Sequence, residues 1–228
     1  MQCVDRLDYT LTMRSVDRTG AARPRTFTET ARRAQIVGAA VDVIAEVGYA
    51  QASLARIADQ LDISKGVILY HFVGKEDLVR EVVAHVWSKG EAFVRQRMQA
   101  APSGVGKLRA YIEACFAYMV GYPNDVIAIV DIARSARDAD GTRLFDSALP
   151  IQAVTDVQKL LIDLRNSDQG TTDFDPAVMA LAIRAAIDAV ADRLRREPDL
   201  DVDLYGRELA TLFERAIRGP TKGSHSCQ

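Results

Sequence analysis

Apolar residues recur at helical spacing through nearly the whole chain, and this pattern constrains the fold more than any other feature of the sequence. No stretch of useful length alternates polar and apolar residues as a half-buried strand does. No run of about 18 consecutive apolar residues, the length that predicts a membrane span, is present either. The sequence therefore predicts an all-α protein of about nine helices with no membrane partner.

Residues that end helices divide this pattern into separate segments. Gly, Pro, Asn and Asp gather between the apolar runs, and a Pro after an Asp, as at Asp175-Pro176, is a favourable helix start. There is no repeat of fixed period that would indicate a solenoid. The expected helices span residues 28–47, 54–61, 65–72, 75–101, 105–122, 125–137, 147–165, 176–196 and 202–218.

The second and third expected helices are short and close together in the sequence. Gly48 ends the helix before them, and Ser53 and Ser64 stand where helix N-caps belong. Asp62 and Ile63 leave room only for a very tight turn, and Asp tolerates a left-handed backbone better than most residues. Two short helices joined in this way form the helix-turn-helix pattern, whose second helix enters the major groove of DNA.

Residues 39–78 combine several short motifs: Gly48-Tyr49, Ile57-Ala58, Ser64-Lys65-Gly66, Tyr70-His71-Phe72 and Lys75-Glu76-Asp77-Leu78. In residues and spacing this segment resembles the DNA-binding domain of the TetR family of transcriptional regulators. The resemblance implies a homodimeric, non-enzymatic regulator, in its usual form a repressor that a small-molecule effector releases from its operator. Phe72 is expected to tie the third helix to the first. Two positions depart from the family: Leu69 stands where Tyr is usual, which removes one hydroxyl contact, and Asp62 stands where the turn usually has Gly.

DNA contacts are expected mainly from the start and the end of the third helix. Gly66 has no side chain, so this turn can approach DNA closely, while Ser64 and Lys65 supply a hydroxyl and a cation. Tyr70 and His71 carry donors for backbone phosphates. The alternative for Ser64 and Lys65 is a helix cap and a solvated charge. The residues expected to contact double-stranded DNA are Arg32, Ser53, Arg56, Ser64, Lys65, Gly66, Val67, Tyr70, His71 and Lys75.

The longer C-terminal segment is expected to bind the effector. The helix over residues 105–122 is apolar nearly all round, as at the centre of a bundle, and a pocket there would take a small apolar or aromatic molecule. Such a stripe is more often plain core, and a DNA-bound dimer with no effector remains the alternative function. The candidate pocket residues are Trp87, Tyr111, Cys115, Phe116, Tyr118, Met119 and Phe145.

Two apolar stripes near the C-terminus favour self-association, because symmetric dimers normally read the two half-sites of an operator. The alternative is that these stripes face only the core of their own bundle. The residues expected at the dimer interface are Met179, Ile183, Val190, Leu194, Leu209, Leu212 and Phe213.

Charge helps to divide the chain into parts. Seven Arg against four acidic residues make residues 1–33 basic, although the whole chain carries a net charge of -2. We expect a flexible basic arm over residues 1–27, a DNA-binding domain over 28–74, a ligand-binding and dimerisation domain over 75–219 and a disordered tail over 220–228. The first residues lack the apolar segment of a secretory signal, so a cytoplasmic location is expected.

Other kinds of chemistry have little support in the sequence. The three Cys lie far apart and the three His are scattered, so neither a disulfide framework nor a metal site is expected, and no cofactor is predicted. A Gly-rich phosphate loop, a GxSxG motif and an HExxH motif are all absent, so an enzyme is not expected.

Overall fold

A computed structural model describes residues 26–102, 104–137, 140–145, 151–167 and 173–218. These residues are helical apart from turns and an isolated bridge between Arg137 and Arg143, so the all-α prediction is confirmed. Nearly all of the predicted N-terminal arm and the whole predicted tail lie outside the described residues. The helices in the described part are α1 (Phe27–Val47), α2 (Leu54–Gln60), α3 (Lys65–His71), α4 (Lys75–Ala100), α5 (Val105–Gly121), α6 (Pro123–Ser135), α7 (Ile151–Asn166), α8 (Pro176–Ala191) and α9 (Val202–Arg218).

The sequence determines several of these helix ends through side chains near the backbone. Thr26 and Glu29 form a capping box at the start of α1, and Gly48 ends the helix with φ 84°. The Ser53 side chain accepts a hydrogen bond from a backbone N–H of α2, and Asp175 accepts two from the first turn of α8. The predicted caps at Ser53 and Asp175 are confirmed.

The predicted ends of the sixth and eighth helices differ from the structure. The sixth helix starts at Pro123 rather than Asp125, because a Pro fits the first helical position, where no N–H is needed. The eighth helix ends at Ala191, and the chain continues in turns over residues 192–196 where helix was expected. The predicted start of the seventh helix, Ser147, lies outside the described residues.

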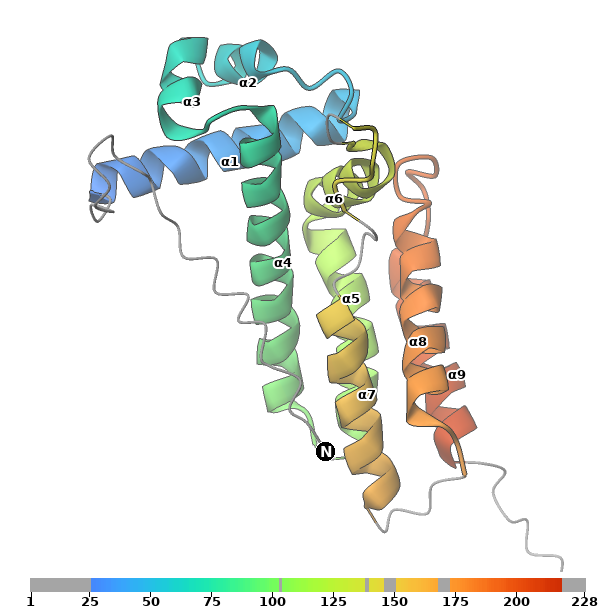
Figure 1. The fold of residues 1–228 in the computed structure, drawn as a ribbon. Coiled ribbons are helices and arrows are strands. Elements are labelled where there is room, and N and C mark those ends of the chain that lie inside the picture. Colours follow the sequence, from blue (N-terminus) through green and yellow to red (C-terminus); the bar gives the residue numbers. More distant parts are fainter. Residues whose placement is uncertain (1–25, 103, 138–139, 146–150, 168–172, 219–228) are drawn as a thin grey trace, which may run out of the picture.

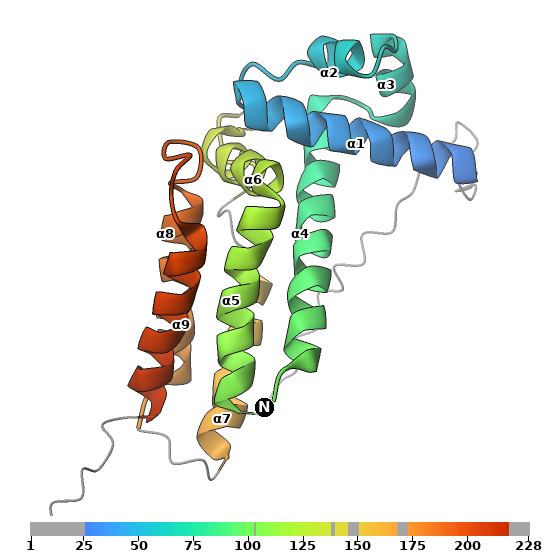
Figure 2. The same cartoon turned by 180° about the vertical axis from the view of Figure 1, so that it is seen from behind.

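The helices form two layers that meet at α6. Figure 1 shows α1 lying across one end of the molecule, with α2 and α3 on its outer side and α4 descending from it. Figure 2, seen from behind, shows α5, α8 and α9 running lengthwise, with α7 behind them and α6 short and close to the end of α1. The helix-turn-helix unit therefore projects at one end of a long bundle.

Two apolar clusters hold these layers, and they divide the chain differently from the predicted domains. The first cluster joins α1, α2 and α3 with the first half of α4 and most of the buried face of α6. The second joins α5, α7, α8 and α9 with the far half of α4. Val130 of α6 packs against both clusters. A boundary at residues 74 and 75 thus cuts through the first core, since α4 and α6 belong to it.

Within the described residues no single helix is both long and apolar enough to cross a membrane. One pair of helices, Val105–Gly121 and Pro123–Ser135, has sufficient length and apolar composition only when the two are taken together, and it is bent by 97°.

Candidate DNA-binding interface

The turn between α2 and α3 has the tight geometry predicted from the sequence. The N–H of Ile63 donates to the Ala58 carbonyl at 3.1 Å, and the N–H of Asp62 donates to the Asp59 carbonyl at 3.2 Å. Asp62 has φ 52°, in the left-handed region that Asp tolerates better than most residues. These bonds fix the angle at which α3 leaves α2.

One face of α3 is anchored in the first core. Ile68 and Phe72 are 0% and 1% exposed, and this confirms the prediction that Phe72 ties α3 to the rest of the domain. Arg33 of α1 covers the Phe72 ring at 4.0 Å, donates to the His71 carbonyl and pairs with Glu81 of α4 at 3.0 Å. These contacts join α1, α3 and α4 around a single buried guanidinium.

Sequence reasoning did not single out Arg33, although a signal for it existed. Arg33 is spaced three and seven residues before Ile36 and Ala40, so it lies on the buried stripe of α1. Its neighbour Arg32, which was predicted to contact DNA, is exposed. A charged residue that falls on the buried stripe of a helix is almost never left without a partner. This pattern could have identified Arg33 from the sequence.

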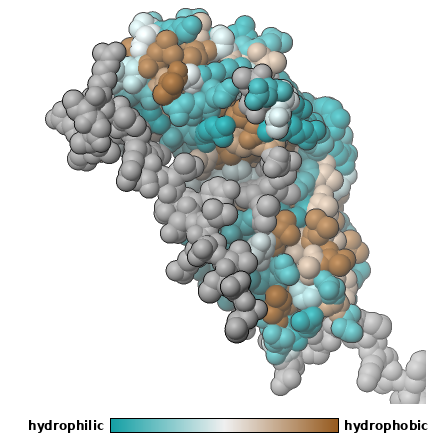
Figure 3. Space-filling view, viewed as in Figure 1, coloured by the Kyte–Doolittle hydropathy of each residue, from teal (hydrophilic) through white to brown (hydrophobic). Residues whose placement is uncertain are grey.

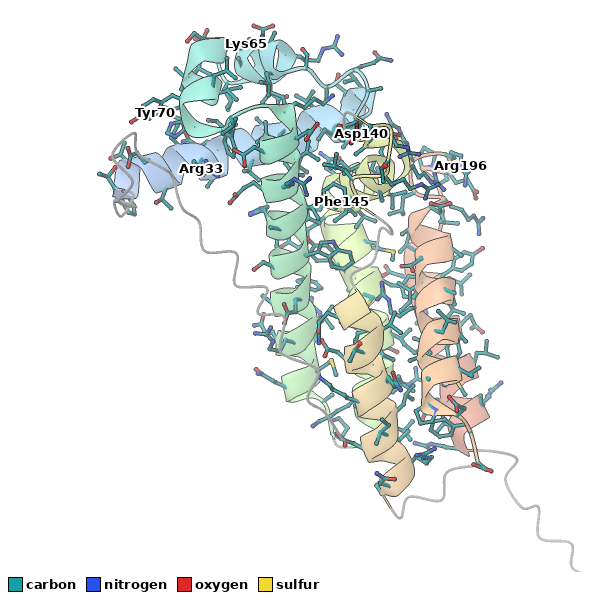
Figure 4. The ribbon with its side chains drawn as sticks, in the orientation of Figure 1. Arg33, Lys65, Tyr70, Asp140, Phe145 and Arg196 are labelled. Carbon is teal, nitrogen blue, oxygen red and sulfur yellow. The ribbon has the colours of Figure 1, made fainter. Side chains whose placement is uncertain are left out.

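The opposite face of α3 is open to solvent. Ser64, Lys65 and Gly66 at its start are exposed, and Figure 4 shows Lys65 at the outer tip of the helix. The Ser64 side chain makes no capping hydrogen bond to α3, so its hydroxyl does not serve as a helix cap. Leu69 is 47% exposed. The start of α3 therefore presents a hydroxyl, a cation and an uncovered backbone together.

The end of α3 is more constrained than the sequence suggested. Tyr70 is 73% exposed, and its hydroxyl donates to Glu29 of α1 at 3.4 Å. Hydrogen bonds from Thr26 lower the pKa of Glu29, so this acceptor stays ionised near neutral pH. The His71 ring is partly buried and lies edge-on to Tyr70, 5.0 Å between centroids. Figure 4 shows Tyr70 on the side of α3 that faces the start of α1.

The side chain of Lys75, which was predicted to contact a phosphate, is held by the turn after α1. Its ammonium donates to the Tyr49 carbonyl at 2.5 Å and sits 4.2 Å from the centre of the Tyr49 ring. Burial lowers its pKa. The side chain thus joins the start of α4 to the turn after α1, and a phosphate contact would require this bond to break.

The remaining predicted contact residues are on the surface to different degrees. Arg56 on α2 is exposed, as is Ser53, whose hydroxyl already accepts the capping bond. Val67 is only partly exposed because it lies beside the buried Ile68. Of the predicted residues on α3, Lys65, Gly66 and Tyr70 are exposed, and so is Ser64 at its N-cap.

Helix α6 holds the turn after α1 through Asp131. Its carboxylate accepts the N–H of Tyr49 at 2.5 Å and lies 3.6 Å from Arg195. Arg195, from the turn between α8 and α9, also donates to the Glu46 carbonyl at 3.2 Å. Gly48 is needed at this point, because a Cβ there would approach Asp131 to 3.2 Å on a backbone with φ 84°. The bundle is thus bonded directly to the joint between α1 and α2.

Replacing Asp131 with alanine is expected to lower the free energy of unfolding by about 1–3 kcal/mol, because the Tyr49 N–H loses its acceptor. Urea denaturation measures this loss, and amide hydrogen exchange should speed up at Tyr49 first. Asp156→Ala on the exposed part of α7 is the control, with an expected change below about 0.5 kcal/mol. Equal effects of the two substitutions would show that Asp131 does not stabilise this joint.

A second polar group connects α4, α5 and α6. Buried Asp125 accepts hydrogen bonds from the Tyr118 hydroxyl and the Lys89 ammonium, each at 2.7 Å. The Lys89 ammonium also lies 3.8 Å from the centre of the Tyr122 ring. Burial and the neighbouring Asp125 carboxylate raise the pKa of Tyr118, so its hydroxyl remains a donor. Asp125 thus joins the start of α6 to the middle of α4.

The structure does not bring the predicted pocket residues together. Trp87 and Phe145 pack against the first cluster, whereas the five residues from α5 belong to the second. The Tyr118 hydroxyl is already hydrogen-bonded to Asp125. Phe116 is 1% exposed and packs so closely on α9 that a Cβ at Gly206 would lie 3.0 Å from it. The two apolar clusters thus divide the seven residues between them, and a pocket lined by these residues stays a prediction.

The predicted dimer residues also need correction. Ile183, Val190 and Phe213 are 0%, 3% and 9% exposed, so they form part of the core of their own bundle. Met179, Leu194 and Leu209 are half-buried against the same core, whereas Leu212 is 58% exposed. The alternative that these stripes face inward holds for most of them.

A different face of α8 is apolar and exposed. Val178 and Leu181 are 67% and 62% exposed, and the small side chains of Ala182, Ala185 and Ala189 share their face. Figure 3 shows hydrophobic surface over this part of the bundle and again over the outer end of α3. The sequence did not reveal this face, because α8 is apolar on both sides.

Comparison with known proteins points to the same part of the chain. Residues 36–82 match the family model described as bacterial regulatory proteins, tetR family, and this range holds α2, α3 and parts of α1 and α4. Over 94 residues the chain is 34% identical to HTH-type transcriptional regulator BetI 1 of Chromohalobacter salexigens. This segment of the chain belongs to the TetR family of DNA-binding domains.

The relatives differ in how much of their length is matched. The match to BetI 1 covers 41% of this chain and 46% of that protein, so the alignment spans about half the length of this curated TetR-family relative. HTH-type transcriptional activator FasR of Mycolicibacterium smegmatis is 26% identical over 75% of this chain and 76% of its own length. The family model, for its part, matches only residues 36–82.

Solved structures extend the TetR fold over most of the chain. FadR from Bacillus subtilis, solved in complex with stearoyl-CoA, superposes with a TM-score of 0.64 and 21% identity over 81% of this chain and 98% of its own. KstR2 of Mycobacterium tuberculosis, a ketosteroid transcriptional regulator, superposes with a TM-score of 0.63 and 19% identity over 88% of this chain and 99% of its own. At these identities the likeness establishes the fold.

Proposed function

We propose that the protein is a sequence-specific, DNA-binding regulator of transcription that acts in the cytoplasm as a homodimer and leaves its operator when a small-molecule effector binds in the bundle. The observation that carries the proposal is the exposed start of α3, where Ser64, Lys65 and Gly66 stand clear of the core. The family match over the same residues supports it.

The exposed side of α3 fits the major groove. Lys65 supplies a cation for a guanine edge or a phosphate, and Gly66 lets the backbone come close. Leu69, 47% exposed, presents an apolar side chain that suits the methyl group of thymine. Tyr70 exchanges its bond to Glu29 for a phosphate, since a hydroxyl 3.4 Å from its acceptor is weakly held.

Replacing Lys65 with alanine is expected to weaken operator binding about tenfold or more while leaving stability and assembly unchanged. Fluorescence anisotropy on DNA enriched from a random-sequence library measures the affinity, and repeating it at several salt concentrations should show a shallower salt dependence. Lys107→Ala, at an exposed lysine of α5, is the matched control. If both variants bind like the wild type, α3 is not the reading helix.

The exposed face of α8 is proposed as the contact with a second copy of the chain. This face consists of apolar residues, and its short side chains let two helices approach closely. The residues are Val178, Leu181, Ala182, Ala185 and Ala189. A dimer places two copies of α3 at the spacing of two half-sites. Leu212 of the neighbouring helix α9 is also exposed, and α8 and α9 lie side by side in Figures 1 and 2.

Release from DNA is proposed to pass through α6. This helix packs into the first core and is bonded to the α1–α2 joint by Asp131 and to α4 by Asp125. A ligand that binds better when α6 is displaced would shift the protein towards a state with a different spacing of the two α3 helices. FadR was solved in complex with stearoyl-CoA, which supports control by a ligand. FasR is named an activator, so the experiment has to determine whether the effector causes release or binding.

A thermal-shift screen of small molecules tests the ligand half of this proposal, because binding to the folded state raises the apparent stability. Each molecule that raises the melting temperature is then added to the anisotropy assay. Loss of DNA affinity supports effector release, whereas stabilising ligands that leave DNA affinity unchanged would favour a dimeric regulator with no effector.

A further inference from the structure

A buried arginine with an unpaired donor lies inside the bundle between α5 and α8. Arg184 of α8 is 6% exposed. Its Nη1 donates to the Tyr111 hydroxyl at 2.7 Å and lies 3.7 Å from Cys115 Sγ, and its Nη2 donates to Asp188 Oδ1 at 3.0 Å. Its Nε is buried and makes no hydrogen bond to any residue that the structure describes.

The geometry of α8 explains why Nε stays unpaired. Asp188 is one turn further along the same helix and reaches Arg184 from one end, through Nη2 alone. Tyr111 and Cys115 come from α5 and occupy the Nη1 side. The edge of the guanidinium formed by Nε and Nη2, the edge that binds a carboxylate with two parallel hydrogen bonds, is therefore only half used.

The neighbours of Arg184 are suited to an anionic ligand rather than to another cation. Burial raises the pKa of Tyr111 and of the Cys115 thiol, so both stay neutral and neither competes as an anion. The only carboxylate bonded to Arg184 is that of Asp188, within the described residues, and its side chain is 32% exposed. The pair of Arg184 and Asp188 thus extends from the apolar core of the bundle to its surface.

We propose that Arg184 anchors the acidic head of the effector, so that the effector is a carboxylate on an apolar body. The carboxylate would accept hydrogen bonds from Nε and Nη2 of Arg184, in competition with Asp188, while the apolar body lies among the residues of the second cluster. This inference rests on the proposed function in one respect only, that the bundle binds a ligand. The effector is then expected to be acidic, whereas the sequence indicated only that it is apolar or aromatic.

Matched pairs of ligands separate the charge of the head group from the apolar body. The probes are decanoate, hexadecanoate and 4-phenylbutyrate, each compared with the alcohol of the same carbon skeleton. Binding is measured by the fluorescence of Trp87, the single Trp of the chain, and by thermal shift. At least one acid is expected to bind about 10- to 100-fold more tightly than its alcohol, the value of a charge-assisted hydrogen-bonded pair.

Two substitutions change this preference in opposite directions. Arg184→Gln should remove the preference for the acid while leaving the affinity for the alcohol unchanged. Asp188→Asn removes the competing carboxylate and should tighten binding of the acid about tenfold, again with no change for the alcohol. Arg193→Gln, in the turn after α8, is the control that should leave both affinities unchanged. If Arg184→Gln does not fold, Asp188→Asn carries the test alone.

The possible outcomes distinguish this inference from the proposed function. If acids and alcohols bind equally, if no probe binds, or if Asp188→Asn has no effect, Arg184 is a structural group whose Nε is hydrated, and the inference is overturned even though DNA binding stands. If the acid binds through Arg184 but leaves DNA affinity unchanged, the inference stands and effector release fails.

Discussion

Replacing Phe72 with alanine is expected to lower the free energy of unfolding by about 3–5 kcal/mol. Phe72 is 1% exposed, it closes the first core at the end of α3, and the Arg33 guanidinium covers its ring at 4.0 Å. The substitution leaves a cavity and removes the cation–π contact. Urea denaturation followed by circular dichroism measures the loss, and DNA affinity should fall as well because α3 loses its anchor.

The neighbouring Val73 is a matched control for this substitution. It is 94% exposed, so Val73→Ala should change the free energy of unfolding by less than about 0.5 kcal/mol. A loss below about 1 kcal/mol for Phe72→Ala would mean that α3 is not held through this residue.

Replacing Leu181 with glutamate is expected to break the dimer and to weaken operator binding about 100-fold or more, because the two half-sites would then be bound independently. Leu181 is at the centre of the exposed apolar face of α8, where burying a carboxylate against a second copy is costly. Sedimentation velocity measures the change from dimer to monomer. The folded monomer should keep its helical content, since Leu181 is 62% exposed.

Val120 of α5 is the control for the dimer surface. It is 51% exposed but lies on another helix, so Val120→Glu should leave the dimer intact. A dimer that survives Leu181→Glu, or one that Val120→Glu breaks instead, would assign the interface to another face of the bundle.

The sequence was sufficient to predict the helices and the reading turn, because local chemistry specifies both. Caps at Ser53 and Asp175, the glycine at position 48 and the left-handed Asp62 each act within a few residues of the chain. The exposed start of α3 follows from the same local pattern, since Ile68 and Phe72 must face the core.

Contacts between distant residues were beyond the sequence. The roles of Arg33 and Arg184 depend on partners 38 and 73 residues away, and periodicity does not report such pairs. Lys75 donates to the Tyr49 carbonyl 26 residues before it. A residue that the sequence indicated as a surface charge therefore connects the start of α4 to the turn after α1. The two faces of α8 could not be told apart because both are apolar.

Dimethyl sulfate footprinting on the enriched DNA tests whether α3 enters the major groove from two copies of the chain. Methylation occurs at guanine N7 in the major groove, the edge that Lys65 would cover. We expect two protected segments related by a dyad and separated by about 10 base pairs or a multiple of that, with both lost in Lys65→Ala. Protection of a single segment, or bound DNA with every N7 still reactive, would contradict it.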